Sequence, residues 1–88
     1  MKWAYELTHA AQKDLKDLPG NVRERVARTL DEMALDPFQG DVKALRGKEW
    51  KGIFRRRIGS YRILFLANTS TRILSVVRIL IRSETTYR

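Results

Sequence analysis

Residues 54–63, with the sequence FRRRIGSYRI, decide the fold of this chain. Apart from Arg56, apolar and charged side chains alternate on both sides of Gly59-Ser60, a pattern typical of two strands joined by a tight turn. A two-residue loop joins adjacent antiparallel strands and fixes how they pair. Counting outward from the loop, Ile58 faces Tyr61 and Arg57 faces Arg62. The stretch therefore predicts a β-hairpin with a defined register.

This register sorts the side chains of the hairpin onto two faces, because successive residues of a strand point to opposite sides of the sheet. The face expected to pack against helices is apolar except for Arg56, and it holds Phe54, Ile58, Tyr61, Ile63 and Phe65. The other face holds Lys51, Arg55, Arg57 and Arg62, with Leu64 and Leu66 among them.

The facing pair Arg57 and Arg62 is unfavourable for folding. Like charges directly across a strand pair cost from tenths of a kcal/mol up to about 1 kcal/mol. One interpretation is that each arginine simply reaches solvent. The interpretation that we favour is a cradle for phosphate groups.

Residues before the hairpin predict a strand followed by two helices. Residues 2–7 alternate and are expected to form the strand. Thr8 is expected to cap a first helix, which Pro19-Gly20 ends, and Asn21, with Glu24 three residues later, is expected to cap a second helix that ends before Pro37. Two apolar stripes at helical spacing support the helices: Ala11, Leu15 and Leu18 in the first, and Val22, Val26, Leu30 and Met33 in the second.

From residue 50 the apolar period changes to two, and the segments 50–58, 61–67 and 72–82 are predicted strands. The predicted fold is α+β: an N-terminal strand, a helical hairpin, and then an antiparallel β-meander with the helices packed on one face of the sheet. In the last strand, strict alternation places Ile73, Ser75, Val77, Ile79 and Ile81 toward the core. Its other side would carry Arg72, Arg78 and Arg82 with Leu74, Val76 and Leu80, which would gather all these arginines except Arg56 on the surface opposite the helices.

Charge is distributed unevenly along the chain. Residues 1–44 carry seven Lys/Arg and eight Asp/Glu, a net charge of −1, whereas residues 45–88 carry eleven and two, a net charge of +9; together they give the +8 of the whole chain. Arg outnumbers Lys nine to two in the second half, and the planar guanidinium suits bidentate contacts with phosphate. This pattern predicts a polyanionic partner such as RNA, DNA or an acidic protein.

Length and composition exclude several classes of protein. The 88 residues suffice for one domain, 1–88, and there is no cysteine for a disulfide or a thiolate metal site. We see no signal-peptide pattern, and the longest apolar run, Ile63 to Ala67, is far shorter than the ~20 residues of a membrane span. We therefore expect a cytoplasmic protein. No acidic pair, His/Cys cluster or glycine-rich phosphate loop is visible, so no metal or cofactor is expected.

Four segments of the chain together resemble the RelE/ParE toxin superfamily. They are DPF at 36–38, KALRG at 43–47, FRRRIGSYRI at 54–63, and the closing RILIR at 78–82 followed by Tyr87. The resemblance implies one strand, a helical hairpin and a mostly antiparallel sheet. It also implies a toxin of a type II toxin–antitoxin system that a cognate RelB-like antitoxin neutralises in a hetero-oligomer.

Members of this superfamily differ in their targets. The resemblance implies that a RelE-type member enters the A site of the small ribosomal subunit and cleaves mRNA without a metal, whereas a ParE-type member has the same fold and inhibits DNA gyrase. The residues that carry cleavage in RelE-type members correspond here to Arg55 and Arg57, Arg62, Arg82 and Tyr87. Arg46 and Arg78 are further candidates for phosphate binding.

Two departures from the family pattern leave the acid and the base of the reaction open. Some active members have a lysine where this chain has Ile53, and Lys51 is the nearest replacement. Many have a histidine where this chain has Ile81. Arginine stabilises a charged phosphorane but is a poor proton shuttle. Tyr87, near positive charge, is the first candidate for proton transfer, and Lys51 is the second.

Other assignments remain as alternatives. His9, the single histidine, is expected at the surface near the start of the first helix, away from the arginines, and Trp50 is expected to pack more than to stack on a base. The main alternative function is a ParE-like gyrase inhibitor without nuclease activity. A plain RNA-binding domain is the third, and it predicts no toxicity.

Overall fold

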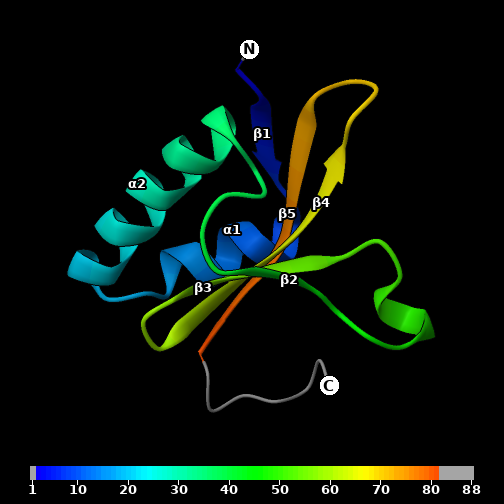
Figure 1. Ribbon diagram of the computed structural model, residues 1–88. Helices are drawn as coiled ribbons and strands as arrows, with labels where there is room; N and C mark the ends of the chain where they lie inside the picture. The colour runs from blue at the N-terminus through cyan, green and yellow to red at the C-terminus, as the bar shows by residue number, and fades with distance from the viewer. Residues whose placement is uncertain (1, 82–88) are drawn as a thin grey trace.

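A five-stranded mixed sheet and two helices make up the computed structural model, which describes residues 2–81 (Figure 1). The elements follow in the order β1 (Ala4–Leu7), α1 (His9–Lys16), α2 (Gly20–Leu35), β2 (Val42–Ala44), the 3-10 turn η1 (Lys48–Trp50), β3 (Phe54–Ile58), β4 (Tyr61–Asn68) and β5 (Ile73–Ile81). The sheet order is β1-β5-β4-β3-β2, with β1 parallel to β5 and the other pairs antiparallel. The predicted α+β class is confirmed, and β2 is an edge strand that the sequence pattern did not predict.

The hairpin of β3 and β4 has the predicted register. Ile58 pairs with Tyr61 and Arg57 pairs with Arg62, and the pairing continues back to Phe54, the first residue of β3. Gly59 has a φ of +55°, which glycine adopts without steric cost and other residues rarely adopt. The two-residue loop therefore fixes which residues of the two strands lie side by side.

The start of β3 differs from the prediction of a strand over 50–58. Residues 48–50 form η1, and the chain turns again at Gly52, whose φ is +83°. Lys51 consequently lies in a turn before the strand. Alternation of residue types could not reveal this, because a short helical turn next to a strand disturbs the period by only a few residues.

The two helices begin differently from each other. The hydroxyl of Thr8 accepts the N–H of Ala11 at 3.2 Å, which confirms the predicted cap of α1. The predicted cap of α2 by Asn21 is wrong: α2 already begins at Gly20, after Pro19, with no side-chain cap. The first N–H groups of a helix have no hydrogen-bond partner within the helix. Proline, which has no N–H, is therefore tolerated at a helix start. Neither helix of the described part is long and apolar enough to cross a membrane.

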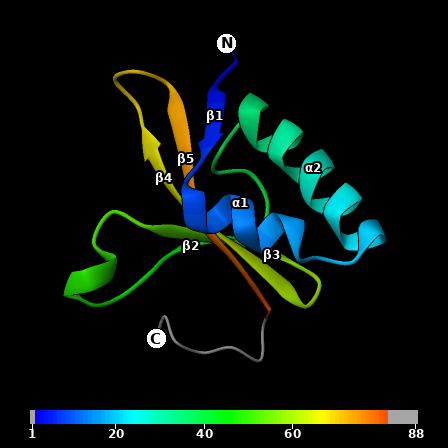
Figure 2. The ribbon, with the colours of Figure 1, turned by 180° about the vertical axis from the view of Figure 1, so that it is seen from behind.

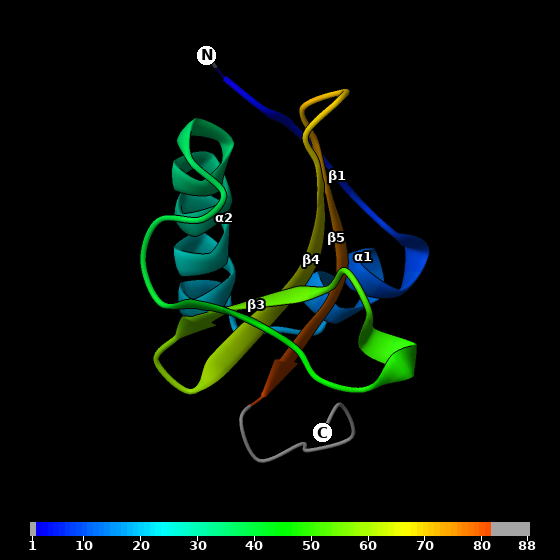
Figure 3. The ribbon, with the colours of Figure 1, turned by 45° about the vertical axis from the view of Figure 1, so that its right-hand side comes forward.

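The hydrophobic core lies between the helices and the sheet. Figures 2 and 3 show the twist of the sheet and the two helices beside it. From α2 it takes the predicted stripe, including Val26, Leu30 and Met33, and from α1 it takes Ala11. Fully buried Ile63 and Phe65 of β4 meet these side chains, and Phe54 and Ile58 of β3 pack against them. The apolar face predicted for the hairpin is therefore the face that the helices cover.

Strand β5 departs from strict alternation. Leu64 pairs with Arg78, but the next residue, Phe65, pairs with Val76, so Val77 is an extra residue in β5. A bulge of one residue reverses which side chains face the core. The prediction for Ile79 is correct, whereas Ile81, which was also expected to face the core, is 38% exposed at the end of the strand. For the first half of the strand the prediction was wrong, because Leu74 and Val76 are fully buried in the core in place of Ile73 and Ser75.

Candidate phosphate-binding site

The sheet face turned away from the helices carries a group of charged side chains, which we call the arginine face. It comprises Asp41, Lys43, Arg55, Arg57 and Arg62. Lys43 of β2 pairs with Arg55, and the predicted pair of Arg57 with Arg62 is confirmed. The N–H of Arg57 donates to the carbonyl of Asp41 at 3.0 Å, which extends the ladder by one residue beyond β2. Three strands thus bring residues from distant parts of the sequence together.

Exposure differs among the arginines of this face. The side chain of Arg57 is 43% exposed, whereas Arg55 and Arg62 are each only 8% exposed. Their cross-strand neighbours Leu64 and Leu80 are buried too. The expectation of an open arginine surface therefore needs correction: the side chain of Arg57 is partly open to solvent, and Arg55 and Arg62 are nearly buried, where charge interactions are stronger than in water.

Asp41 links two of these arginines. Its Oδ1 lies 3.3 Å from Nη1 of Arg55, and its Oδ2 lies 3.4 Å from Nε of Arg57. The hydrogen bond from Arg55 and the positive charges of Arg55, Arg57 and Lys43 lower the pKa of Asp41, against an opposing effect of desolvation. Asp41 is thus a carboxylate that stays ionised in a basic site.

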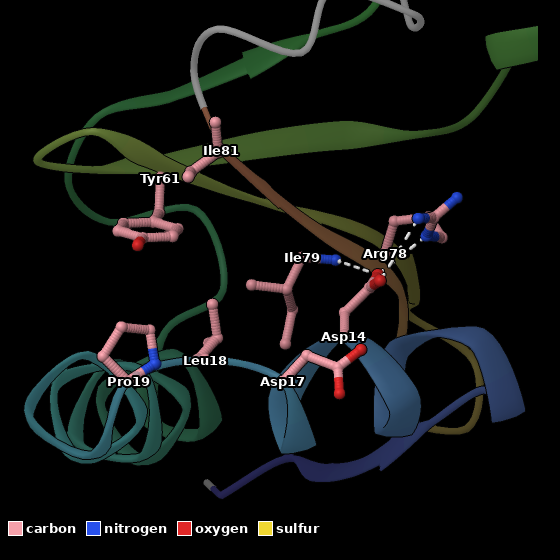
Figure 4. A pocket seen from close by; sticks show the side chains of 8 residues that line it. All are labelled: Asp14, Asp17, Leu18, Pro19, Tyr61, Arg78, Ile79 and Ile81. Atoms are coloured by element: carbon pink, nitrogen blue, oxygen red, sulfur yellow. Dashed lines mark hydrogen bonds and ion pairs between the residues drawn. The ribbon is translucent and has the colours of Figure 1, made fainter.

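Arg78 of β5 is directed to a different partner. Its Nε donates to Oδ2 of Asp14 on α1 at 2.7 Å, and its Nη2 donates to Oδ1 at 3.2 Å (Figure 4). The backbone N–H of Ile79 donates to the same carboxylate at 2.9 Å. The guanidinium of Arg78 therefore ties β5 to α1, and a phosphate would have to compete with Asp14 for it.

A hollow of about 400 Å³ lies beside this link. Figure 4 shows that Leu18 and Pro19, between the two helices, line it from one side and the strand residues Tyr61 and Ile81 from the other. Tyr61 and Ile63 alternate with Arg62, and Ile63 belongs to the core, so Tyr61 is on the helix side of the sheet. The hollow is therefore separate from the arginine face.

The other predicted site residues lie outside the sheet or outside the described residues 2–81. Arg46 and Lys51 are exposed in the segment between β2 and β3, and His9 is the exposed first residue of α1. Lys51 is thus not beside Arg55 on the strand, which removes the geometric reason for choosing it as a proton donor or acceptor. The predictions for Arg82 and Tyr87 fall outside the described residues.

Two residues of the arginine face, Asp41 and Lys43, were not chosen from the sequence. Their spacing on either side of Val42 is that of one face of a strand, but three residues are too few to indicate a strand by periodicity. Within residues 2–81, no three His, Cys, Asp or Glu side chains come together as a group that could hold a metal ion. The arrangement offers cationic donors for anionic oxygens.

Comparisons with known proteins relate the chain to toxins of toxin–antitoxin systems. Residues 5–86 match the family model of the ParE toxin of the type II toxin–antitoxin system parDE. The chain is 29% identical to the putative toxin RelE1 of Methanocaldococcus jannaschii, over 100% of this chain and 98% of that protein. It is 34% identical to toxin RelE3 of the same organism, over 67% of this chain and 69% of that protein.

Solved structures have the same fold. The toxin–antitoxin complex RelBE2 of Mycobacterium tuberculosis contains a chain with a TM-score of 0.83 at 24% identity, covering 93% of this chain and 100% of that one. The isolated RelE toxin of E. coli gives a TM-score of 0.77 at 19% identity, covering 96% of this chain and 88% of that one. Because the family match spans nearly the whole sequence, this chain belongs to the RelE/ParE superfamily of toxins of type II toxin–antitoxin systems.

Proposed function

We propose that this toxin is a ribosome-dependent endoribonuclease that cleaves mRNA in the ribosomal A site without a metal ion, arrests translation in the cytoplasm, and is neutralised by a RelB-like antitoxin. The observation that carries the proposal is the cross-strand pair Arg57 and Arg62 on the face of the sheet that the helices leave uncovered. Such a like-charge pair costs folding stability. An RNA backbone would offset that cost by placing phosphates between the guanidinium groups. The two relatives named RelE favour this function over the other targets of the superfamily.

Cleavage of RNA by its own 2′-hydroxyl needs a proton acceptor, stabilisation of the phosphorane, and a proton for the leaving 5′-oxygen. Arginines suit the second task because they keep their charge and offer paired donors. Arg62, nearly buried between Arg57 and Leu80 on the neighbouring strands, would act most strongly on the scissile phosphate, together with Arg82. Exposed Arg57 and Lys43 would hold the flanking phosphates.

Proton transfer belongs to other groups in this proposal. Tyr87, which lies outside the described residues, is the first candidate, because it corresponds to the C-terminal tyrosine of RelE-type members. Lys51 is a weaker candidate, because it lies in the turn before β3. Arg55 is nearly buried and bonds to Asp41, so we assign it to the support of Arg57 and of the segment before β2.

Primer extension on cellular mRNA after brief induction tests the proposal. We expect cuts within translated frames that disappear when the antitoxin is co-expressed. Arg57→Ala should reduce cutting by roughly tenfold or more, the effect of losing about 1.4 kcal/mol of transition-state stabilisation. Arg62→Lys, which keeps the charge but removes the paired donors, should reduce it further.

The matched control is Arg28→Ala, which removes one exposed arginine from α2, on the opposite side of the sheet. It should cut mRNA as wild type does. Binding of the antitoxin should persist in all three variants, which would show that they are folded. Full cutting by Arg57→Ala and Arg62→Lys would rule out the arginine face as the site of cleavage.

The second candidate is inhibition of DNA gyrase, which the match to the ParE family model favours. The same induction experiment separates the two functions. Gyrase-linked DNA breaks with intact mRNA would establish a ParE-like toxin. If induction does not arrest growth, the protein would instead be a plain RNA-binding domain.

A further inference from the structure

The carboxylate of Asp41 lies between two arginines of the proposed RNA site. Its two oxygens approach Arg55 Nη1 at 3.3 Å and Arg57 Nε at 3.4 Å. A phosphate presents its oxygens to arginine donors in a similar way. Asp41 therefore takes up donors of the arginine face that a nucleic-acid backbone would otherwise use.

The backbone at Asp41 is held firmly. Its carbonyl accepts the N–H of Arg57 at 3.0 Å and Nη1 of Arg55 at 3.3 Å. From the helix side of the sheet, Nη1 of Arg56 donates to the carbonyl of Gln39 at 3.0 Å, and the guanidinium lies directly against Gly40, whose φ is +90°. The segment 39–41 is thus anchored in place, and side-chain rotation is the motion left to the carboxylate.

The contacts of the carboxylate itself are weak. Both are longer than the roughly 2.7–2.9 Å of a strong charge-assisted hydrogen bond. The side chains of Asp41 and Arg57 are 47% and 43% exposed, so water and salt screen their attraction. An incoming phosphate can therefore displace the carboxylate without unfolding the segment.

We infer that Asp41 is an internal counter-anion of the arginine face: its carboxylate occupies Arg57 and Arg55 in the free toxin, and an RNA phosphate replaces it on exposed Arg57 when RNA binds. Asp41 consequently weakens the affinity for RNA. This inference rests on the proposed function. A role as general base suits Asp41 poorly, because a carboxylate whose pKa is lowered by Arg55 is a weak proton acceptor.

The test is the affinity of the purified full-length toxin for a fluorescent 12-nucleotide 2′-O-methyl RNA, which cannot be cleaved, measured by anisotropy over a range of NaCl concentrations. Asp41→Asn keeps the size of the side chain and removes its charge. We expect roughly three- to tenfold tighter binding at low salt. The slope of log K against log[NaCl] should steepen by about 0.7, the value for one more neutralised phosphate of a single strand.

Two controls separate charge from structure. Asp41→Glu keeps the charge and should bind within about twofold of wild type, because the local electrostatics persist. Glu24→Gln makes the same change in net charge on the exposed side of α2 and should leave the slope unchanged.

Each other outcome overturns the inference. Tighter binding by Asp41→Glu as well would assign the effect to loosening of the segment, and weaker binding by Asp41→Asn would make the carboxylate a support for the arginines. Equal RNA binding by wild type and Asp41→Asn would overturn the inference while the proposed function stands. Absence of binding by every variant would overturn the arginine face as a phosphate site along with it.

Discussion

Arg56 is the residue that the apolar pattern of β3 does not explain. It shares the helix side of the strand with Phe54 and Ile58, yet its guanidinium bonds to the carbonyl of Gln39 and lies 3.4 Å from the carboxylate of Glu32. It therefore connects α2 to the segment that leads into β2. A charged residue on a core face is tolerated here because its long stem packs on apolar groups while its end reaches polar partners at the rim.

Ionisation of Asp41 makes the stability of the fold depend on pH. Its pKa in the folded state is lowered, first by the hydrogen bond from Arg55, so its contribution to stability is present above the pKa of the unfolded chain and is lost as the pH falls through the folded value. We expect Asp41→Asn to lower the free energy of unfolding at pH 6, and the difference from wild type to shrink below about pH 4. Urea denaturation at pH 6, 4 and 3 measures this, and a difference that grows toward low pH would contradict it.

Side chains at the start of α1 and within it bond to the backbone of β5 beyond the point where β1 ends. β1 pairs with β5 only from Ile73 to Val76. Beyond this point, the hydroxyl of Thr8 donates to the carbonyl of Val77 at 3.0 Å, and Asp14 accepts the N–H of Ile79. Side chains of a helix thus take the place of a neighbouring strand, which satisfies backbone groups that an edge would leave open.

Removal of this edge contact should destabilise the fold. We expect Asp14→Ala to lower the free energy of unfolding by about 1.5–3 kcal/mol, the usual range for a hydrogen bond to a charged group. Most of the loss would come from the N–H of Ile79, because the guanidinium of Arg78 is partly exposed and its ion pair is screened. Chemical denaturation followed by circular dichroism gives the value.

Asp17→Ala is the matched control for this element, since Asp17 is exposed at the end of α1 and lines the same hollow. A surface change of this kind should stay within roughly 0.5 kcal/mol of wild type. Equal losses in the two variants would show that the edge contact has no special importance.

The excess positive charge of the whole molecule comes from the half of the sequence that forms β3, β4 and β5. The helices and β1 come from the half of the sequence with a net charge of −1, and β3, β4 and β5 come from the half with +9. Asp41, Glu32 and Asp14 of the first half pair with arginines of the second half. The carboxylates of these pairs are already counted in the net charge of +8, and this net charge attracts a polyanionic partner.

This imbalance predicts how salt affects the free toxin. Screening of the repulsion among the arginines should raise stability, and relief of ~0.5 kcal/mol would raise Tm by roughly 2–4 °C for a domain of this size. Thermal melts of the free toxin in 20 mM and 300 mM NaCl measure this. A lower Tm at the higher salt concentration would mean that the ion pairs outweigh the repulsion.

The periodic pattern of the sequence was enough by itself to predict the elements in which apolar residues repeat regularly. The register of β3 against β4, the stripe of α2 and the cap of α1 followed from residues close together in the sequence, because a two-residue loop and the helical repeat leave little freedom. The pairing of Arg57 with Arg62 was predicted for this reason.

Only the tertiary structure decided the remaining features. The extra residue Val77 arises from the pairing of two whole strands, and the burial of Arg62 depends on what surrounds it. The meeting of Asp41 with Arg55 and Arg57 joins segments 14 to 16 residues apart. A sequence pattern describes one element at a time, whereas these contacts depend on how several elements pack together.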